Sequence, residues 1–591
     1  MPDLRTDPVT VAQLLQADNL YWTPLFQREY VWQKSKITML FEDALTLVDE
    51  RSDSRFLGAI VLEAEEPRIG HPTRYWVIDG QQRLTTLFII LVAIVGELNR
   101  LGESERASSL AESYLLVSAA GAMKNEPKYR PTVLDTSQFN VVLRSMRHPD
   151  VVVIEQPQGP EAGRMVQGLK LTQRLLKKQF DGMEDEVAVE WLWEFASCLL
   201  TGVRFVSITL GDDHEPTEVF DRLNARGEPL KVIDLVRNDV MKVVAKDLDK
   251  AVPLRDQFWL PFHDAFGGNE SAEQKYFFPL ALTRDQSVKK SQVFEMLAKR
   301  WDRMRDDSED QSPENLVRIA IDDLREYQDA YCALILTGAL DLTRSELAPE
   351  DRTALNLRIN RLQRLSASVV TMPYLMQVVN GIVDLSIPVK EGVACLDVIE
   401  SFLVRRAIMG MEPTGLHAVF KGLWDPEDFD VESLEERLTT ATVVFPSDAE
   451  FSHYVQNGRL YNRKIDAFVL WERELGYPAG DQHQQLLDFH VSHIIPRNLT
   501  DEELAGWNGW SKEEWQALKN TWANLVPLSP AGNWQMGRRN WSDMCELLEG
   551  NLIFKTPQHL LLDYESWMPD DVHARGLELA SWAIGRWPKH T

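Results

Sequence analysis

The stretch at 79–83, Asp-Gly-Gln-Gln-Arg, joins a strand-like run to a long apolar pattern that starts at Leu84. Glycine allows a tight turn, and the N–H groups at the start of a helix attract anions together with the helix dipole. Arg83 adds a fork of donors that suits phosphate oxygens. The stretch therefore predicts a phosphate cradle, although an ordinary polar strand–helix turn has the same composition. It is not a P-loop, because the sequence contains no GxxxxGK[ST].

The remaining side chains of this stretch extend the prediction from phosphate to a nucleotide. The carboxylate can hold a metal ion or order the loop, and the two amides can bind a ribose, a base or an attacking water. The residues predicted to bind a nucleotide are Asp79, Gly80, Gln81, Gln82 and Arg83.

A second group of candidates lies near the C-terminus, where 488–497 reads DFHVSHIIPR, a strand-like run that ends at His493. A short strand, a glycine-containing turn and a helix pattern follow from 522 onward. This order is that of a ββα-metal nuclease finger, in which a histidine takes a proton from water and a bound Mg²⁺ stabilises the developing charge. An asparagine orients the loop or binds the metal. A lone HxxP is a weak signal, because most such histidines are structural.

Composition limits the function classes. The chain has 591 residues, of which 44% are hydrophobic and 26% charged, which suits about three to five globular domains. The formal net charge of −27 argues against a broad basic face, so any nucleic-acid contact must be confined to a local patch or be weak until something else switches it on. The longest apolar run, 88–96, is shorter than the ~20 residues that span a bilayer, and we expect neither a membrane partner nor a signal peptide. Four cysteines without a CxxC pair suit a reducing, cytoplasmic location.

The elements that must position these candidates follow from periodicity. We predict strands at 56–64, 74–78, 150–155 and 204–210, and helices at 84–100, 104–120 and 161–180. The chain is almost wholly helical from about 245 to 440 and rich in Trp and Asn from about 445. Three arginines of the helical part share one helix face and are either solvated or part of a DNA track: Arg358, Arg361 and Arg364. The predicted fold class is α+β with three domains, at 1–245, 246–444 and 445–591.

The N-terminal motifs resemble those of the GmrS-type nucleotidase domain, which is related in fold to the ParB/sulfiredoxin group. Four signatures stand in the family's order: FQR-x-Y-x-W at 26–32, FLG at 56–58, DGQQR at 79–83, and F-x-x-LN-x-RG-x-x-L…DL-x-RN at 220–238. The resemblance implies nucleotide binding and hydrolysis, with Arg226 added to the nucleotide site, and sensing of modified DNA. Exposed aromatic residues stack on bases, whereas buried ones pack in a core. The residues predicted to sense DNA or its modification are Gln27, Arg28, Tyr30 and Trp32.

The C-terminal motifs resemble the GmrD-type HNH nuclease domain, whose pattern runs roughly EHI-x-P…GNL-x-L…N…F-x-x-K. The resemblance implies His493 as general base, Asn524 as the residue that tethers the loop, Asn533 as a metal ligand, and phosphate contacts by Arg538, Arg539 and Asn540. Two positions depart from the pattern. Ser492 stands where an acidic residue is usual, and Met544 stands near the place of the lysine. His490 or Asp488 could replace the missing acidic ligand, so the predicted metal ligands are His490, Asp488 and Asn533.

Together the two ends resemble fused GmrSD-type and SspE-type modification-dependent restriction enzymes. This implies a ParB/sulfiredoxin-like domain, a helical middle and a ββα-metal (HNH) finger. It also implies antiviral defence by NTP-coupled cleavage or nicking of double-stranded phage DNA that carries glucosylated or hydroxymethylated cytosine or phosphorothioate. The implied cofactors are Mg²⁺ or Mn²⁺ and an NTP, which is GTP, ATP, CTP or UTP. A homodimer is compatible with this function.

Two other functions stay open at this point. One is a nucleotide-dependent DNA-binding switch with a degenerate nuclease finger, which Ser492 and Met544 favour. The other is an NTPase that depletes nucleotide pools, with the C-terminal domain acting only as its gate. Cleavage that is abolished by His493→Ala would argue against the switch. The NTPase function predicts nucleotide turnover that is unaffected by His493→Ala and indifferent to DNA.

Overall fold

The computed structural model describes residues 5–16, 19–24, 27–49, 54–66, 71–118, 123–155, 157–210, 231–244, 247–366, 369–477, 488–507, 509–530 and 540–590. Residue contacts divide the chain into two units. The first comprises 1–260 and 301–320, and the second comprises 261–300 and 321–591.

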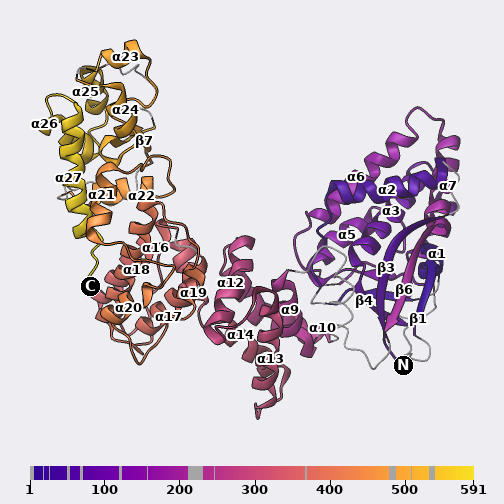
Figure 1. The fold of residues 1–591 in the computed structure, drawn as a ribbon. Helices are drawn as coiled ribbons and strands as arrows, with labels where there is room; N and C mark the ends of the chain where they lie inside the picture. Colours follow the sequence, from indigo (N-terminus) through magenta and orange to yellow (C-terminus); the bar gives the residue numbers. More distant parts are fainter. Residues whose placement is uncertain are drawn as a thin grey trace. The chain divides into compact units, whose positions relative to one another are not determined.

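The first unit is built on a mixed six-stranded sheet with the order β1-β6-β3-β4-β2-β5 (Figure 1). Two neighbouring pairs, β1 with β6 and β3 with β4, are antiparallel, and the other pairs are parallel. The strands are β1 (Arg5–Thr10), β2 (Leu20–Trp22), β3 (Arg55–Ala64), β4 (Arg74–Asp79), β5 (Tyr129–Arg130) and β6 (Val203–Leu210).

Helices pack against one face of this sheet and form the main core of the unit. They are α1 (Val11–Gln16), α2 (Lys34–Asp49), α3 (Gln81–Arg100), α4 (Ser104–Tyr114), α5 (Thr136–Arg144), α6 (Arg164–Gln179) and α7 (Asp185–Gly202). Alternate strand residues such as Ile60, Leu62, Val77 and Phe205 point into this core. Their neighbours Val61, Trp76, Ile78 and Ile208 form a small separate cluster. The core thus places the end of β4 and the start of α3 side by side.

Helix α3 is apolar all round because it is a core helix. By length and composition it could cross a membrane, but 89% of its 18-residue apolar stretch is buried inside the protein. The apolar run that the sequence shows at 88–96 therefore belongs to the protein core, between α4, α6 and α7.

Most predicted elements of this unit are present, with two corrections. The predicted strand at 150–155 is wrong: the Asn140 amide donates to the Ile154 carbonyl and accepts from the Ile154 N–H, so a side chain takes up backbone groups that a neighbouring strand would use. The helix predicted at 104–120 ends at Tyr114, because Leu116 and Val117 pair with the backbone of 126–127.

The described part of the chain from residue 231 onward is largely helical. Its helices are α9 (Val232–Met241), α10 (Leu248–Leu254), α11 (Leu260–Asp264), α12 (Glu270–Arg284), α13 (Val293–Asp306), α14 (Pro313–Arg325), α15 (Gln328–Cys332), α16 (Pro349–Arg364), α17 (Met372–Val383), α18 (Val389–Met409), α19 (Leu416–Phe420), α20 (Val431–Leu438), α21 (Asp448–Asn457), α22 (Asp466–Leu475), α23 (Asp501–Ala505), α24 (Lys512–Leu518), α25 (Trp541–Glu549), α26 (Lys555–Asp563) and α27 (Pro569–Arg586).

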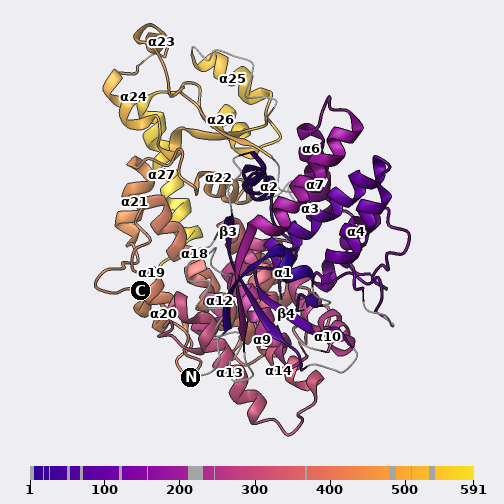
Figure 2. The ribbon, with the colours of Figure 1, turned by 90° about the vertical axis from the view of Figure 1, so that its right-hand side faces the viewer.

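Within the second unit, the only sheet in its described residues is the antiparallel pair β7 (His490–His493) and β8 (Leu525–Leu528). Two short helices, α23 and α24, lie between these strands along the chain, and helix α25 follows β8. In both views α23, α24 and α25 gather at one end of this unit, and α20 lies toward the other (Figure 1 and Figure 2). Buried tryptophans, among them Trp522, Trp567 and Trp587, form the core around the strand pair.

Candidate functional site

The stretch at 79–83, called the loop here, comprises the end of β4, Gly80 and the first residues of α3. Asp79 is the last residue of β4, and Gly80 occupies the N-cap position with φ +93°. A side chain at Gly80 would be strained at that φ, and its Cβ would meet Ile60 Cγ1 at 3.1 Å. No side chain caps α3, which leaves the helix start to backbone groups and the helix dipole.

Both glutamine amides of the loop bind the backbone of the 27–31 segment. Gln81 Nε2 donates to the Arg28 carbonyl at 3.1 Å, and Gln82 Nε2 donates to the Glu29 carbonyl at 3.0 Å. Gln82 Oε1 accepts from the Val31 N–H at 2.9 Å. The two side chains are 6% and 8% exposed. In this conformation they hold two motifs together, and the predicted contacts to a ribose, a base or a water stay a prediction.

Arg83 joins the loop to the third motif, FLG at 56–58. Its guanidinium donates to the carbonyls of Leu57 and Ala59 at 3.1 and 2.8 Å, and lies 3.7 Å from the Asp79 carboxylate. Gly58 has φ +99°, and a Cβ there would lie 2.5 Å from the Arg83 guanidinium. The glycine of FLG is therefore explained by the close approach of an arginine from DGQQR.

The residues predicted to sense DNA lie beside this loop, but they are not equally accessible. Gln27 is buried and donates to the Ile78 carbonyl at 2.8 Å. Tyr30 is 4% exposed and its hydroxyl lies 2.7 Å from Thr86 Oγ1, so its ring cannot stack on a base in this conformation. Trp32 is partly buried against the core, and Arg28 is half-buried. Arg226 lies outside the described residues, as does most of the 218–240 motif.

A buried carboxylate, missed in the sequence, also holds the 27–31 segment. Asp135 Oδ2 accepts from the Tyr30 N–H at 2.7 Å and from the Thr132 hydroxyl at 3.2 Å. Burial raises the pKa of Asp135 to about 7, against the lowering effect of the Tyr30 N–H bond, and the charge of Glu29 raises it further. This carboxyl therefore titrates near neutral pH beside the candidate nucleotide loop.

We expect this carboxyl to make the stability of the N-terminal domain fall as pH rises from about 4 to about 7. Over that range the folded state holds a proton that the unfolded state has lost, so each pH unit costs up to about 1.4 kcal/mol. Asp135→Asn cannot titrate and should flatten this slope in denaturant unfolding at pH 4.5 and 7.5. Asp181→Asn, at an exposed position, is the control. A slope that Asp135→Asn leaves unchanged would contradict the assignment.

His493 ends β7 and is 8% exposed. Its Nε2 lies 3.3 Å from Asn520 Oδ1, and its ring centroid lies 4.2 Å from that of Tyr461. Where Nε2 carries the proton and donates to Asn520, Nδ1 is the basic nitrogen of the ring. Sequence reasoning missed Tyr461 and Asn520. The only signal was that Asn520 precedes the predicted tether by four residues.

Asn524 is fully buried and binds the loop that follows His493. Its Nδ2 donates to the carbonyls of Ile495 and Lys519 at 3.0 and 2.9 Å. Its Oδ1 accepts from the Ile495 N–H at 3.0 Å and from Trp567 Nε1 at 3.2 Å. Every polar atom of the amide is used, so these are the contacts of a tether and leave no oxygen for a metal.

The other predicted residues of this centre are placed less favourably. Asn540 caps α25, because its Oδ1 accepts from the Asp543 N–H at 3.0 Å. Asp488 and His490 are exposed, and no group of three His, Cys, Asp or Glu side chains within the described ranges could hold a metal. Asn533, Arg538 and Arg539 lie outside those ranges. Residues that the structure describes therefore do not build a metal site.

The three arginines proposed as part of a DNA track are ion-paired instead. Arg358 lies 2.9 Å from Asp397, and Arg361 and Arg364 lie 3.8 and 3.1 Å from Glu472, which is 2% exposed. Arg361 and Arg364 pair with Glu472 because a buried carboxylate needs cationic partners, whereas the partner of Arg358 is partly exposed. These ion pairs do not favour a DNA track on this helix face, which stays a prediction.

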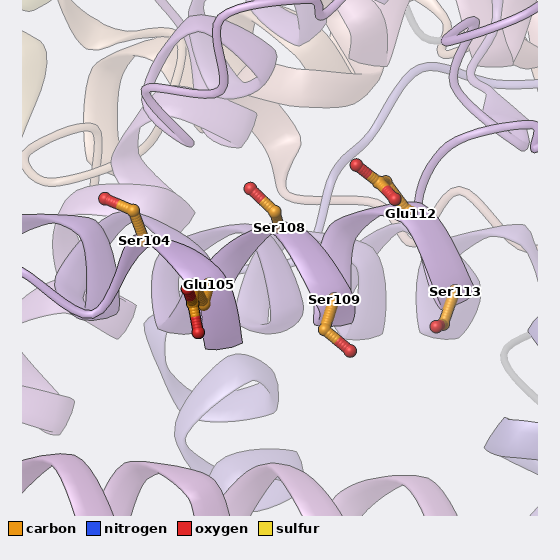
Figure 3. A pocket seen from close by; sticks show the side chains of 6 residues that line it. All are labelled: Ser104, Glu105, Ser108, Ser109, Glu112 and Ser113. Carbon is orange, nitrogen blue, oxygen red and sulfur yellow. The ribbon is translucent and has the colours of Figure 1, made fainter.

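A hollow of about 560 Å³ lies along α4 and is lined by Ser104, Glu105, Ser108, Ser109, Glu112 and Ser113. Figure 3 shows that all six side chains come from one helix. No other element supplies a wall, and none of the predicted site residues lines it. It is a polar helix face, and it plays no part in the candidate sites.

Comparison with known proteins gives the class and then the family. The model described as GmrSD restriction endonuclease, N-terminal domain, matches residues 11–241, and the model described as GmrSD restriction endonucleases, C-terminal domain, matches residues 445–582. No curated protein matches the chain. Both ends thus define a restriction endonuclease, whose substrate is DNA. The chain belongs to the GmrSD family of modification-dependent restriction enzymes, and the resemblance noted in the motifs is confirmed.

Proposed function

We propose that this enzyme cuts modified DNA at a ββα-metal finger centred on His493, and that an NTP bound at 79–83 controls the cut. One observation carries the nuclease part: His493 ends β7, and Asn524 binds the backbone of Ile495, two residues later. In this proposal His493 takes the proton from the attacking water. Asn520 and Tyr461 hold the imidazole in place, and Asn524 keeps the loop after β7 fixed.

A divalent cation, Mg²⁺ or Mn²⁺, belongs to the proposal because the family is one of nucleases. When bound, it would stabilise the charge that develops on the scissile phosphate. The predicted ligand set is incomplete among described side chains, since Asn524 has no spare oxygen and Ser492 is a buried hydroxyl. We therefore assign no step to the cation, and Asn533 stays a predicted ligand.

The nucleotide part of the proposal rests on the start of α3. The uncapped helix start can receive phosphate oxygens, and the Asp79 carboxylate beside it is partly exposed. Gln81, Gln82 and Arg83 then act by holding the 27–31 and 57–59 segments around the loop. Phosphates bound there would affect the neighbouring 27–32 segment, which we propose to sense the DNA mark. In this segment Arg28 and Trp32 are accessible, and Gln27 and Tyr30 support them.

We expect Asp79→Asn to weaken NTP hydrolysis at least about tenfold, because it removes the only carboxylate of the loop. Purified protein should be assayed for release of phosphate from GTP, ATP, CTP and UTP. Asp43→Asn is the control, because Asp43 pairs with Arg55 at the start of β3 and lies outside the 79–83 stretch. Equal hydrolysis by both variants would exclude the loop as the NTP site.

A second function has one observation in its favour. Among the described residues, no group of three His, Cys, Asp or Glu side chains around His493 could hold a metal, and Ser492 and Met544 are both buried. A switch that binds DNA under nucleotide control without cutting it would have such a finger. Tight, NTP-dependent DNA binding with no cleavage of any modified substrate would support this function.

A further inference from the structure

Three cationic side chains from separate segments gather around His493. Arg459 lies in the loop after α21, Arg497 in the loop after β7, and Lys519 directly after α24. Arg459 and Lys519 lie outside the predicted motifs, so no sequence pattern groups the three.

Their contacts connect them through Tyr461, whose ring packs 4.2 Å from that of His493. Arg459 Nε donates to the Tyr461 carbonyl at 3.2 Å, and the Arg497 guanidinium lies 5.3 Å from the Tyr461 ring centroid. Lys519 Nζ donates to the Arg497 carbonyl at 3.3 Å. A bridge between residues 459 and 521 holds two of the segments together.

None of these three cations lies within 4.0 Å of a carboxylate in the part of the chain that the structure describes. The nearest acidic residue along the 459–464 loop is Asp466, which accepts from the N–H groups of Asn462 and Ala467. Burial and the charge of Arg497 lower the pKa of Lys519. The chain as a whole is acidic, with 90 Asp and Glu against 63 Lys and Arg, so these three cations form a local exception to its net charge.

The chemistry of this group fits phosphodiesters. Arginine binds phosphate oxygens with two parallel donors, and lysine acts as a point charge. Arg459 and Arg497 are exposed and Lys519 is half-exposed, so their charged ends are open to a ligand. Contacts to phosphates fix the position of a protein on a duplex but carry no sequence information.

We propose that Arg459, Arg497 and Lys519 form a phosphate-binding surface that holds duplex DNA against His493. The inference rests on the proposed nuclease function and adds its DNA-binding residues. It also explains how a chain with a net charge of −27 engages DNA: binding is local, and it depends on cations that the rest of the acidic surface does not neutralise. Recognition of the mark is left to the N-terminal domain.

The test is the salt dependence of binding to a duplex of about 30 base pairs, followed by fluorescence anisotropy. The full chain with His493→Ala serves as parent, so that no cutting occurs during titration. Arg459→Gln, Arg497→Gln and Lys519→Gln keep most of each side chain and should each reduce the slope of log affinity against log salt by about 1. Lys512→Gln is the matched control, because Lys512 lies in the same domain but pairs with Asp501 at 2.7 Å.

Unchanged slopes in all three variants, equal loss in Lys512→Gln, or no binding at about 20 mM salt would each overturn the surface. Thermal unfolding of every variant shows whether the fold is kept, and a variant that unfolds early is left out, so that the slopes of the remaining variants decide. Cleavage by the wild-type chain separates the two proposals. Reduced slopes without cleavage of any modified DNA would support the surface and reject the nuclease function. Cleavage with unchanged slopes would support the nuclease function and reject the surface.

Discussion

His493→Ala is expected to abolish DNA cleavage, with a loss of about 10²–10⁴-fold in rate, because it removes the proposed general base. NTP hydrolysis should persist, since His493 and the loop at 79–83 belong to different units of the chain. The measurement is single-turnover cleavage of a modified duplex alongside phosphate release by the same preparation.

His453→Ala is the control for the loss of an imidazole. His453 lies on α21 in the same unit, where its exposed ring is 3.4 Å from the Asn457 amide. Cleavage at the wild-type rate by His493→Ala would contradict the assignment of the base. Equal loss in both variants would indicate damage to the domain rather than to the catalytic centre.

Asn524→Ala is expected to lower the free energy of unfolding of the C-terminal domain by about 2–4 kcal/mol. The change leaves the Ile495 N–H, the carbonyls of Ile495 and Lys519, and Trp567 Nε1 without their shared partner. Denaturant unfolding followed by tryptophan fluorescence suits this measurement, because Trp567 itself reports on the site.

Asn540→Ala provides a comparison of the same chemical change. Asn540 caps α25 at a half-exposed position, and loss of such a cap costs about 1 kcal/mol. If the two substitutions destabilise the protein equally, Asn524 does not act as the buried tether that its hydrogen bonds indicate.

Local sequence signals predicted the elements that depend on local structure. The strand that ends at Asp79, the glycine turn and the long helix after it are present because a β-branched run, a residue suited to positive φ and an apolar helix pattern follow each other directly. The strand predicted at 150–155 failed because β-branched residues also suit an extended segment held by one side chain, here that of Asn140.

The site was harder to predict because its contacts span large distances in sequence. Gln81 and Gln82 meet partners about 50 residues away, and no local pattern distinguishes an amide that holds a loop from one that holds a ligand. The same holds for Asn520, which reaches a histidine 27 residues earlier. The motifs at the two ends of the chain predicted an N-terminal and a C-terminal domain, but only the fold shows which side chains bind each other.

The most direct test of the account is cleavage of one DNA sequence prepared in four forms: unmodified, hydroxymethylated, glucosylated and phosphorothioated. Each form should be incubated with the wild-type chain, Mg²⁺ and each NTP in turn, with His493→Ala in parallel. The account predicts that at least one modified form is cut, that the unmodified form is not, and that His493→Ala cuts none. Cleavage of unmodified and modified DNA at equal rates, or cleavage that survives His493→Ala, would contradict it.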